Sequence, residues 1–323
     1  MLRFVLVLTL LVTACASAQP AAPAVPAAPS VPVEGWPRQI EAADGPVTLE
    51  RQPQRLHALS LGFEEILLAL AGPERLAAVS TIAVNPSYSN SVAIASKVAH
   101  TVGRDPEAIV ATEADVIIAA STSRRDLVDR LRAAGVTVIV PPFRESIDEL
   151  PRTIRWLARI SGDEAAGERM VAAVEERLAR VDRIVATIPD STRPRTLLVT
   201  GVGYAVAGDG ALRHATILRA GGRNAAAEAG IQGDKNIGLE TIVAIDPDII
   251  VTTDDEAGSL ARQLRESPAL ADLSAVKRGR VIALPMPRLA ALSHFQVLGI
   301  EDLARVLHPT AFATPTADFP ERF

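Results

Sequence analysis

Short apolar runs alternate with amphipathic stretches along most of this chain of 323 residues. The runs predict buried strands near 56–61, 76–79, 116–119, 136–140, 196–200, 249–252 and 281–284. Between them, segments such as 64–70 and 124–134 carry apolar residues at helical spacing, and glycines at 72 and 135 are expected to end these two helices. The alternation predicts an α/β fold with parallel sheets.

A long helical stretch interrupts this alternation between 147 and 188, with a break near Gly162. Its second part, 164–188, has apolar residues at helical spacing and would form a helix of about 37 Å at 1.5 Å per residue. Such a helix fits either the surface of one domain or a rigid connector between two. The strand and helix alternation resumes after Pro189.

The second half of the chain repeats part of the first. Residues 107–118 (EAIVATEADVII) align without gaps with residues 240–251 (ETIVAIDPDIIV). Each copy predicts a helix, a turn with an aspartate and a buried strand, followed by a polar loop and an amphipathic helix. The repeat and the long helix together predict two Rossmann-like lobes with central parallel sheets, joined by a single long α-helix.

These patterns suggest the following division of the chain. We expect a signal peptide at 1–18, a Pro/Ala-rich spacer and lead-in at 19–50, an N-terminal α/β lobe at 51–145, a helical connector at 146–189, a C-terminal α/β lobe at 190–310 and a tail at 311–323.

The N-terminus has the pattern of an export signal. Arg3 precedes an apolar run at 4–12, which is too short for a membrane span of about 20 residues and fits a secretory signal peptide. Residues 12–15 (VTAC) match a bacterial lipobox, in which Cys15 would carry lipid, whereas 16–18 (ASA) would direct cleavage before Gln19. Both alternatives predict an extracytoplasmic protein, and the first predicts a lipid anchor to the membrane.

The composition and motif content of the chain argue against several classes of function. The net charge of −5, without a basic stripe, argues against nucleic-acid binding. Cys15 is the only cysteine, so an internal disulfide and a cysteine-cluster metal site are excluded. The five histidines are scattered, which disfavours a bare metal ion as ligand, and no G-x-S-x-G or Walker motif indicates an enzyme. A bare-metal binder and an exported two-lobe enzyme remain the alternatives.

Residues 55 to about 309 resemble the substrate-binding proteins that deliver iron chelates, haem or cobalamin to ABC importers. The resemblance rests on 55–72 (RLHALSLGFEEILLALAG), 102–111 (VGRDPEAIVA), 115–118 (DVII), 238–251 (GLETIVAIDPDIIV) and 307–312 (LHPTAF). It implies a non-enzymatic protein with one long interlobe helix and no cofactor. The transported ligand, an iron–siderophore, haem or cobalamin, would lie between the lobes, and the partner would be a permease dimer.

The resemblance also implies that Glu107 and Glu240, one on each lobe, dock onto arginines of the permease. Paired carboxylates on two rigid lobes suit bidentate contacts with two cationic pockets. Taken alone, Glu107 also fits a structural role, because Asp105 and Pro106 place it in the first turn of a helix, where a carboxylate favours the helix dipole. The matched position of Glu240 in the second lobe favours docking.

Ligand contacts are expected in loops at the carboxyl ends of the strands. The candidates are Ser60, Phe63, Asn85, Tyr88, Ser121, Arg124, Tyr204, Arg288 and His294. If haem iron is held directly, the two tyrosines and His294 are the available axial donors. If the ligand is an anionic chelate, the two arginines matter more.

Overall fold

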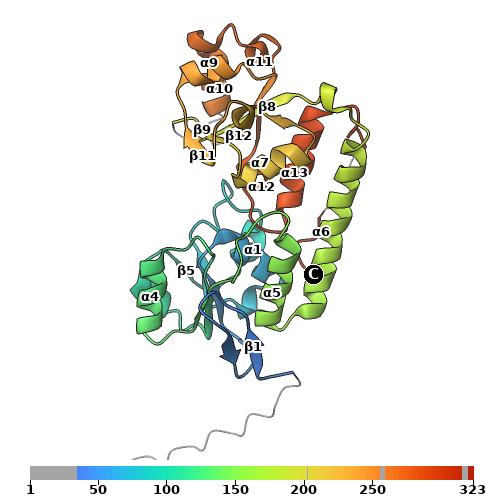
Figure 1. Ribbon diagram of the computed structural model, residues 1–323. Helices are drawn as coiled ribbons and strands as arrows, with labels where there is room; N and C mark the ends of the chain where they lie inside the picture. The colour runs from blue at the N-terminus through green and yellow to red at the C-terminus, as the bar shows by residue number, and fades with distance from the viewer. Residues whose placement is uncertain (1–34, 202, 255–258, 315–318) are drawn as a thin grey trace, which may run out of the picture.

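The computed structural model describes residues 35–201, 203–254, 259–314 and 319–323. Figure 1 shows two α/β lobes, one above the other, with the long helix α6 (Glu164–Val185) running beside both. This architecture confirms the predicted fold class of two lobes with parallel sheets and one long connecting helix. The signal peptide, Cys15 and most of the Pro/Ala-rich spacer lie outside the described residues.

The N-terminal lobe is built on short parallel strands. β3 (Leu56–Ala58), β6 (Val116–Ile118) and β7 (Val138–Ile139) form one sheet in that order, and β4 (Val79–Ser80) pairs with β5 (Thr101–Val102). The 3₁₀-helix η1 (Pro73–Arg75) precedes β4, and the lobe's helices are α1 (Leu61–Leu70), α2 (Val92–Ala95), α3 (Pro106–Val110) and α4 (Arg125–Ala133). Every residue of β3 and β6 is buried, as expected for strands covered on both faces.

An antiparallel hairpin of β1 (Arg38–Ile40) and β2 (Val47–Leu49) covers one end of this lobe. The side chain of Ile40 has no exposed surface, and Nε1 of Trp156 donates a hydrogen bond to the carbonyl of Glu41 at 2.8 Å. Trp156 lies in α5 (Leu150–Ser161), which also packs on α1. The stretch just before residue 51, expected as a lead-in, is therefore packed against the N-terminal lobe.

The C-terminal lobe has a larger sheet. Its order is β11 (Asp234–Asn236), β9 (Ala205–Ala207), β8 (Arg195–Thr200), β12 (Ile249–Asp254) and β13 (Val281–Pro285), and β10 (Arg223–Asn224) also pairs with β8. β8, β12 and β13 run parallel. The helical segments are η2 (Asp190–Thr192), α7 (Leu212–Arg219), α8 (Ala225–Glu228), α9 (Leu239–Ile245), α10 (Ser259–Glu266), η3 (Pro268–Leu270), α11 (Ser274–Lys277), α12 (Met286–Leu289) and α13 (Gln296–Leu307).

The internal repeat has the same hydrogen bonds in both lobes. In the N-terminal lobe, the backbone N–H of Arg55 donates to Oδ2 of Asp115 at 3.0 Å. The Arg55 guanidinium donates to the carbonyls of Thr112 and Glu113, which follow α3, and so satisfies orphan acceptors at that helix end. Glu113 has a left-handed backbone, with φ of 51°.

The C-terminal lobe repeats each of these contacts. The N–H of Arg195 donates to Oδ2 of Asp248 at 2.9 Å, and the Arg195 guanidinium donates to the carbonyls of Ile245 and Asp246, at 3.0 and 2.9 Å. Asp246 is also left-handed, with φ of 39°. The alignment of 107–118 with 240–251 therefore identifies two copies of one structural unit.

Helix α6 forms the connection that its sequence predicts. Its buried face includes Met170, Val174, Leu178 and Val181, and its 22 residues span about 33 Å at 1.5 Å per residue. The helix ends at Val185 rather than near 188, because the following residues form turns ahead of a proline, where helical backbone is disfavoured.

The lobes also meet away from α6. A Cβ on Gly62, in α1, would lie only 2.7 Å from the backbone oxygen of Leu292, which shows how closely the segment between α12 and α13 approaches the N-terminal lobe. Beyond α13 the chain returns to α1, where the N–H of Phe323 donates to the carbonyl of Ala69 at 3.1 Å. The tail follows the C-terminal lobe along the chain and contacts the N-terminal lobe.

Candidate functional site

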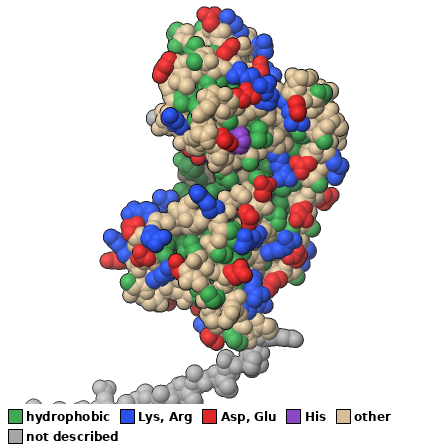
Figure 2. Space-filling model, viewed as in Figure 1, with side chains coloured by type: hydrophobic (Ala, Val, Ile, Leu, Met, Phe, Trp, Pro, Cys, Tyr) green, Lys and Arg blue, Asp and Glu red, His purple; other side chains and the backbone are tan. Residues whose placement is uncertain are grey.

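The two lobes face each other across a cleft, seen in Figure 2 as the hollow that opens between them on the left. Gly62, just after β3, lies against Leu292, and the carbonyl of Pro287, just after β13, accepts a hydrogen bond from Asn90 at 2.8 Å. These contacts bring the carboxyl ends of β3 and β13 together. Loops at such strand ends are where α/β sheets bind ligands.

Two of the predicted cleft residues stand at the start of α1. Ser60 caps this helix, and its hydroxyl accepts a hydrogen bond from the N–H of Phe63 at 3.4 Å. Phe63 itself is only 2% exposed, and its ring centre lies 6.1 Å from that of Trp156. Phe63 is therefore a core residue and offers no surface to a ligand, whereas Ser60 is partly exposed.

The loop after β4 presents an aromatic side chain to solvent. Asn85 organises it, because its side chain accepts from the N–H of Ser87 at 2.9 Å and its carbonyl accepts from the N–H of Tyr88 at 3.0 Å. Tyr88 is 47% exposed. An exposed aromatic ring on an ordered loop is a suitable platform for an apolar or metal-chelate ligand.

Ser121 and Arg124 follow β6, as predicted, but they differ in surroundings. The N–H and hydroxyl of Ser121 both donate to the carboxylate of Glu145, a residue that the sequence pattern did not predict as part of the site. Arg124 is exposed and pairs with Asp126, two residues along the chain. Glu145 lies in the segment after β7, so it joins two loops at the same edge of the sheet.

On the C-terminal lobe, Tyr204 lies in the turn between β8 and β9. Its backbone is left-handed, with φ of 52°, and its carbonyl accepts from the N–H of Ile237 at 3.3 Å, so the turn is tied to the end of β11. Arg288 lies in α12 and pairs with Asp302 at 3.1 Å. Both predicted side chains therefore follow parallel strands, and Arg288 is about half exposed.

His294 does not line the cleft. It has no exposed surface, and its ring is surrounded by those of Phe295, Phe319 and Phe323 at centroid distances of 4.1, 5.8 and 6.0 Å. Among the described residues neither ring nitrogen has a hydrogen-bond partner, and burial lowers the pKa of His294 to about 3. The sequence predicted a ligand contact at His294, but the aromatic residues of the returning tail enclose its ring.

Glu107 and Glu240 occupy equivalent places in the two lobes. Each is exposed in the first turn of its helix, α3 or α9, and each helix ends in the repeated arginine–aspartate arrangement described above. Asp105 caps α3 by accepting from the N–H of Ala108 at 3.4 Å, as the sequence predicts. Among the described contacts, neither carboxylate takes part in a hydrogen bond or an ion pair.

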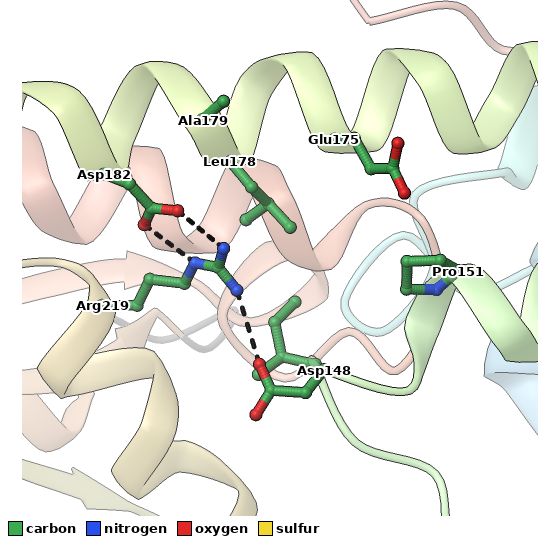
Figure 3. Close-up of a pocket in the computed structure, with 8 residues that line it drawn as sticks. Asp148, Pro151, Glu175, Leu178, Ala179, Asp182 and Arg219 are labelled. Carbon is green, nitrogen blue, oxygen red and sulfur yellow. Dashed lines mark hydrogen bonds and ion pairs between the residues drawn. The ribbon is translucent and has the colours of Figure 1, made fainter.

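A pocket of about 290 Å³ lies where α6 meets both lobes. Figure 3 shows it between α6, the start of α5 and Arg219 of α7. The lining residues are Ile147, Asp148, Pro151, Glu175, Leu178, Ala179, Asp182 and Arg219, none of which the sequence analysis had singled out as a ligand contact.

The described residues contain neither a cluster of metal-ligating side chains nor a helix suited to cross a membrane. They contain no group of three or more His, Cys, Asp and Glu side chains placed to hold a metal ion. No helix within the described ranges combines the length and the apolar character that a membrane crossing requires.

Comparison with known proteins identifies the family to which this chain belongs. Residues 58–287 match the periplasmic binding protein family. The chain belongs to that family. A cobalamin-binding protein of Halobacterium salinarum is 29% identical over 265 residues, which cover 77% of this chain and 70% of that protein. An uncharacterized ABC transporter substrate-binding lipoprotein of Bacillus subtilis, YvrC, is 24% identical over 279 residues, covering 84% and 85%.

Among solved structures, the periplasmic heme-binding protein RhuT of Roseiflexus sp. RS-1 in its apo form superposes on this binding protein with a TM-score of 0.70. The two chains are 26% identical, and the match covers 80% of this chain and 99% of the other. The two-lobed arrangement is thus shared with a solved periplasmic heme-binding protein.

Proposed function

We propose that this binding protein captures a metal chelate of the haem, cobalamin or iron–siderophore class in its interlobe cleft and delivers it to an ABC importer. The observation that supports the proposal most strongly is the two-lobed fold, in which loops from both sheets meet at the cleft. Residues 58–287 of this fold match the periplasmic binding protein family. The cobalamin-binding relative and the haem-binding structural neighbour support this ligand class.

The cleft residues proposed to contact the ligand are Ser60, Asn85, Tyr88, Ser121, Arg124, Tyr204 and Arg288. Tyr88 and Tyr204, one on each lobe, are the candidate oxygen donors for a chelated iron. Arg288 is half exposed and can neutralise a carboxylate or phosphate of the ligand. Phe63 and His294 are left out because both are buried in the core.

The test is a titration of the purified mature protein with haem, cyanocobalamin and a ferric siderophore, followed by absorbance and calorimetry. One of these ligands should bind saturably at one per chain and be recovered chemically unchanged, as expected of a carrier. Tyr88→Phe and Tyr204→Phe should weaken binding and shift the absorption bands if a tyrosine holds the metal. Absence of saturable binding for all three ligands, or turnover of one of them, would overturn the proposal.

We further propose that Glu107 and Glu240 dock onto the permease, and that Cys15 carries a lipid that tethers the protein outside the cytoplasm. The equivalent exposure of the two carboxylates supports the first point. The lipobox pattern and the lipoprotein relative in Bacillus subtilis support the second. Metabolic labelling with a palmitate analogue tests the anchor, since Cys15→Ser should abolish the label and release the protein from membranes.

A further inference from the structure

Two adjacent glutamates of α1, Glu64 and Glu65, are buried almost completely, at 0% and 1% exposed. Carboxylates are rarely buried this fully unless several donors surround them. A pair of neighbouring residues on a helix points in different directions, so each of the two must find its own set of partners. The sets they find lie at opposite ends of one loop.

Glu64 holds the beginning of that loop. Its carboxylate accepts hydrogen bonds from the N–H and the hydroxyl of Ser80, at 2.5 and 2.6 Å. Ser80 is the last residue of β4, immediately before the loop of residues 81–91. The first residues of the loop are therefore fixed to α1.

Glu65 holds the other end of the same loop. Its Oε1 accepts from the N–H of Asn90 at 2.7 Å, with longer contacts to the side chains of Asn90, at 3.4 Å, and Ser89, at 3.5 Å. Between these two anchored ends lies Tyr88, whose ring is half exposed. We call residues 81–91 the Tyr88 loop.

Glu65 and Asn90 also reach the other lobe. The hydroxyl of Ser293, 228 positions along the chain, donates to Oε2 of Glu65 at 2.5 Å. Nδ2 of Asn90 donates to the carbonyl of Pro287 at 2.8 Å. We call residues 287–293, in α12 and just after it, the α12–α13 segment. Glu65 therefore bonds both the Tyr88 loop and this segment, and Asn90, which belongs to the loop, bonds the segment directly, while Glu64 bonds only within the N-terminal lobe.

We propose that Glu65 and Asn90 are positioning residues that couple the Tyr88 loop to the C-terminal lobe, so that ligand contact at Tyr88 and the separation of the lobes change together. Moving either the loop or the α12–α13 segment alone would deprive a buried carboxylate of donors, which is costly in a medium of low dielectric constant. The predicted effect on ligand affinity rests on the proposed function. The predicted effect on the distance between the lobes does not depend on the ligand.

The experiment measures the distance between the lobes by pulsed electron paramagnetic resonance. Spin labels are placed through cysteines at Arg130 of α4 and Arg262 of α10, both exposed, in a Cys15→Ser background. Without ligand, Ser293→Ala and Asn90→Ala should broaden or shift the distance distribution, because each removes one interlobe donor. Glu65→Gln should do the same.

Glu64→Gln is the matched control, since it makes the same change in the adjacent buried residue, which has no contact with the C-terminal lobe among its described hydrogen bonds. It should leave the distances as in the wild type. Circular dichroism verifies that each variant is folded, and the mild Ser293→Ala keeps the test valid if Glu65→Gln is not.

With a bound chelate, the coupling predicts an affinity about tenfold weaker in Ser293→Ala and Asn90→Ala than in wild type, the loss of about one net hydrogen bond. Unchanged distances in these two variants, or an equal change in Glu64→Gln, would overturn the coupling. If the wild-type protein binds none of the chelates, the proposed function fails, yet the distances still decide the coupling.

Discussion

The guanidinium of Arg219 makes two hydrogen bonds to the carboxylate of Asp182, at 3.0 and 2.8 Å, and thereby fixes α7 onto α6 (Figure 3). The same guanidinium lies 3.6 Å from Asp148, just before α5. The bidentate geometry gives this pair more orientation than a single ion pair has. Arg219 thus helps to set the angle between the C-terminal lobe and the connecting helix.

Replacing Arg219 by lysine should lower the free energy of unfolding by about 1 kcal/mol, because lysine cannot form the parallel pair of hydrogen bonds. Urea denaturation monitored by circular dichroism measures the change. Arg124→Lys is the control, since the side chain of Arg124 is 76% exposed against 25% for Arg219, and it should change stability less than Arg219→Lys does. Equal effects at the two sites would contradict the assigned role of Arg219.

His294→Leu should stabilise the protein by about 1–2 kcal/mol, because it removes a buried imidazole that has no hydrogen-bond partner among the described residues. Thermal and urea unfolding report the change. His308→Leu is a suitable comparison, since Nε2 of His308 lies 2.9 Å from the carbonyl of Gly221 and its loss should destabilise. A destabilised His294→Leu variant would show that the imidazole has a partner of its own.

The same residue predicts a pH effect. The folded-state pKa of His294 is about 3, below its ordinary value of 6.5, because burial disfavours the charged ring. Between pH 3 and pH 6.5 the histidine is protonated in the unfolded chain and neutral in the folded protein. The contribution of neutral His294 to the free energy of unfolding is therefore fully present above pH 6.5 and is lost as the pH falls toward 3. The difference in unfolding free energy between His294→Leu and wild type should therefore grow on acidification.

Glu64 predicts the opposite dependence. Burial raises its pKa from 4.5 to about 7, against the lowering effect of the hydrogen bonds from Ser80. The folded state holds the proton more tightly, so this contribution to stability is present below pH 4.5 and is lost as the pH rises through 7. Glu64→Gln, which resembles the protonated acid, should gain on wild type between pH 5 and 8 in urea unfolding; a constant difference would contradict the raised pKa.

The docking proposal predicts separation of uptake from binding. Glu107→Arg combined with Glu240→Arg should abolish chelate uptake by whole cells, since both contacts with permease arginines become repulsive. Affinity for the chelate in solution should stay within about twofold of wild type, because neither residue is proposed to touch the ligand. Glu113→Arg, another exposed carboxylate of the N-terminal lobe, is the control and should transport normally. Lost ligand affinity in the double variant would count against docking.

The lobes were predictable because their signals are local. The repeated segments carry the periodicity, the capping residues and the aspartates that define each unit, and the apolar face of α6 follows directly from its spacing. The candidate site was less accessible to sequence reasoning. Glu64 and Glu65 read as ordinary polar helix residues, and the partner of Glu65 at Ser293 is 228 positions away. No local pattern carries such information.

The same limit explains His294 and the segment just before residue 51. The polar, glycine-containing stretch at 41–46 reads as linker, yet it turns the β1–β2 hairpin, whose Ile40 is buried. His294 follows Ser293 and was predicted as a ligand contact, but the aromatic residues Phe319 and Phe323 of the tail pack against its ring. In both places the outcome depends on tertiary contacts that a single sequence does not specify.

The return of the chain onto α1 has a practical consequence for anyone who handles this protein. A tag, fluorophore or surface linker fused after Phe323 would start from a residue whose backbone is already hydrogen-bonded to Ala69, beside the first helix of the other lobe. Immobilisation through Phe323 would apply force to α1, whose position relative to the C-terminal lobe the distance measurements report. Attachment at exposed residues of α4 or α10 avoids that interference.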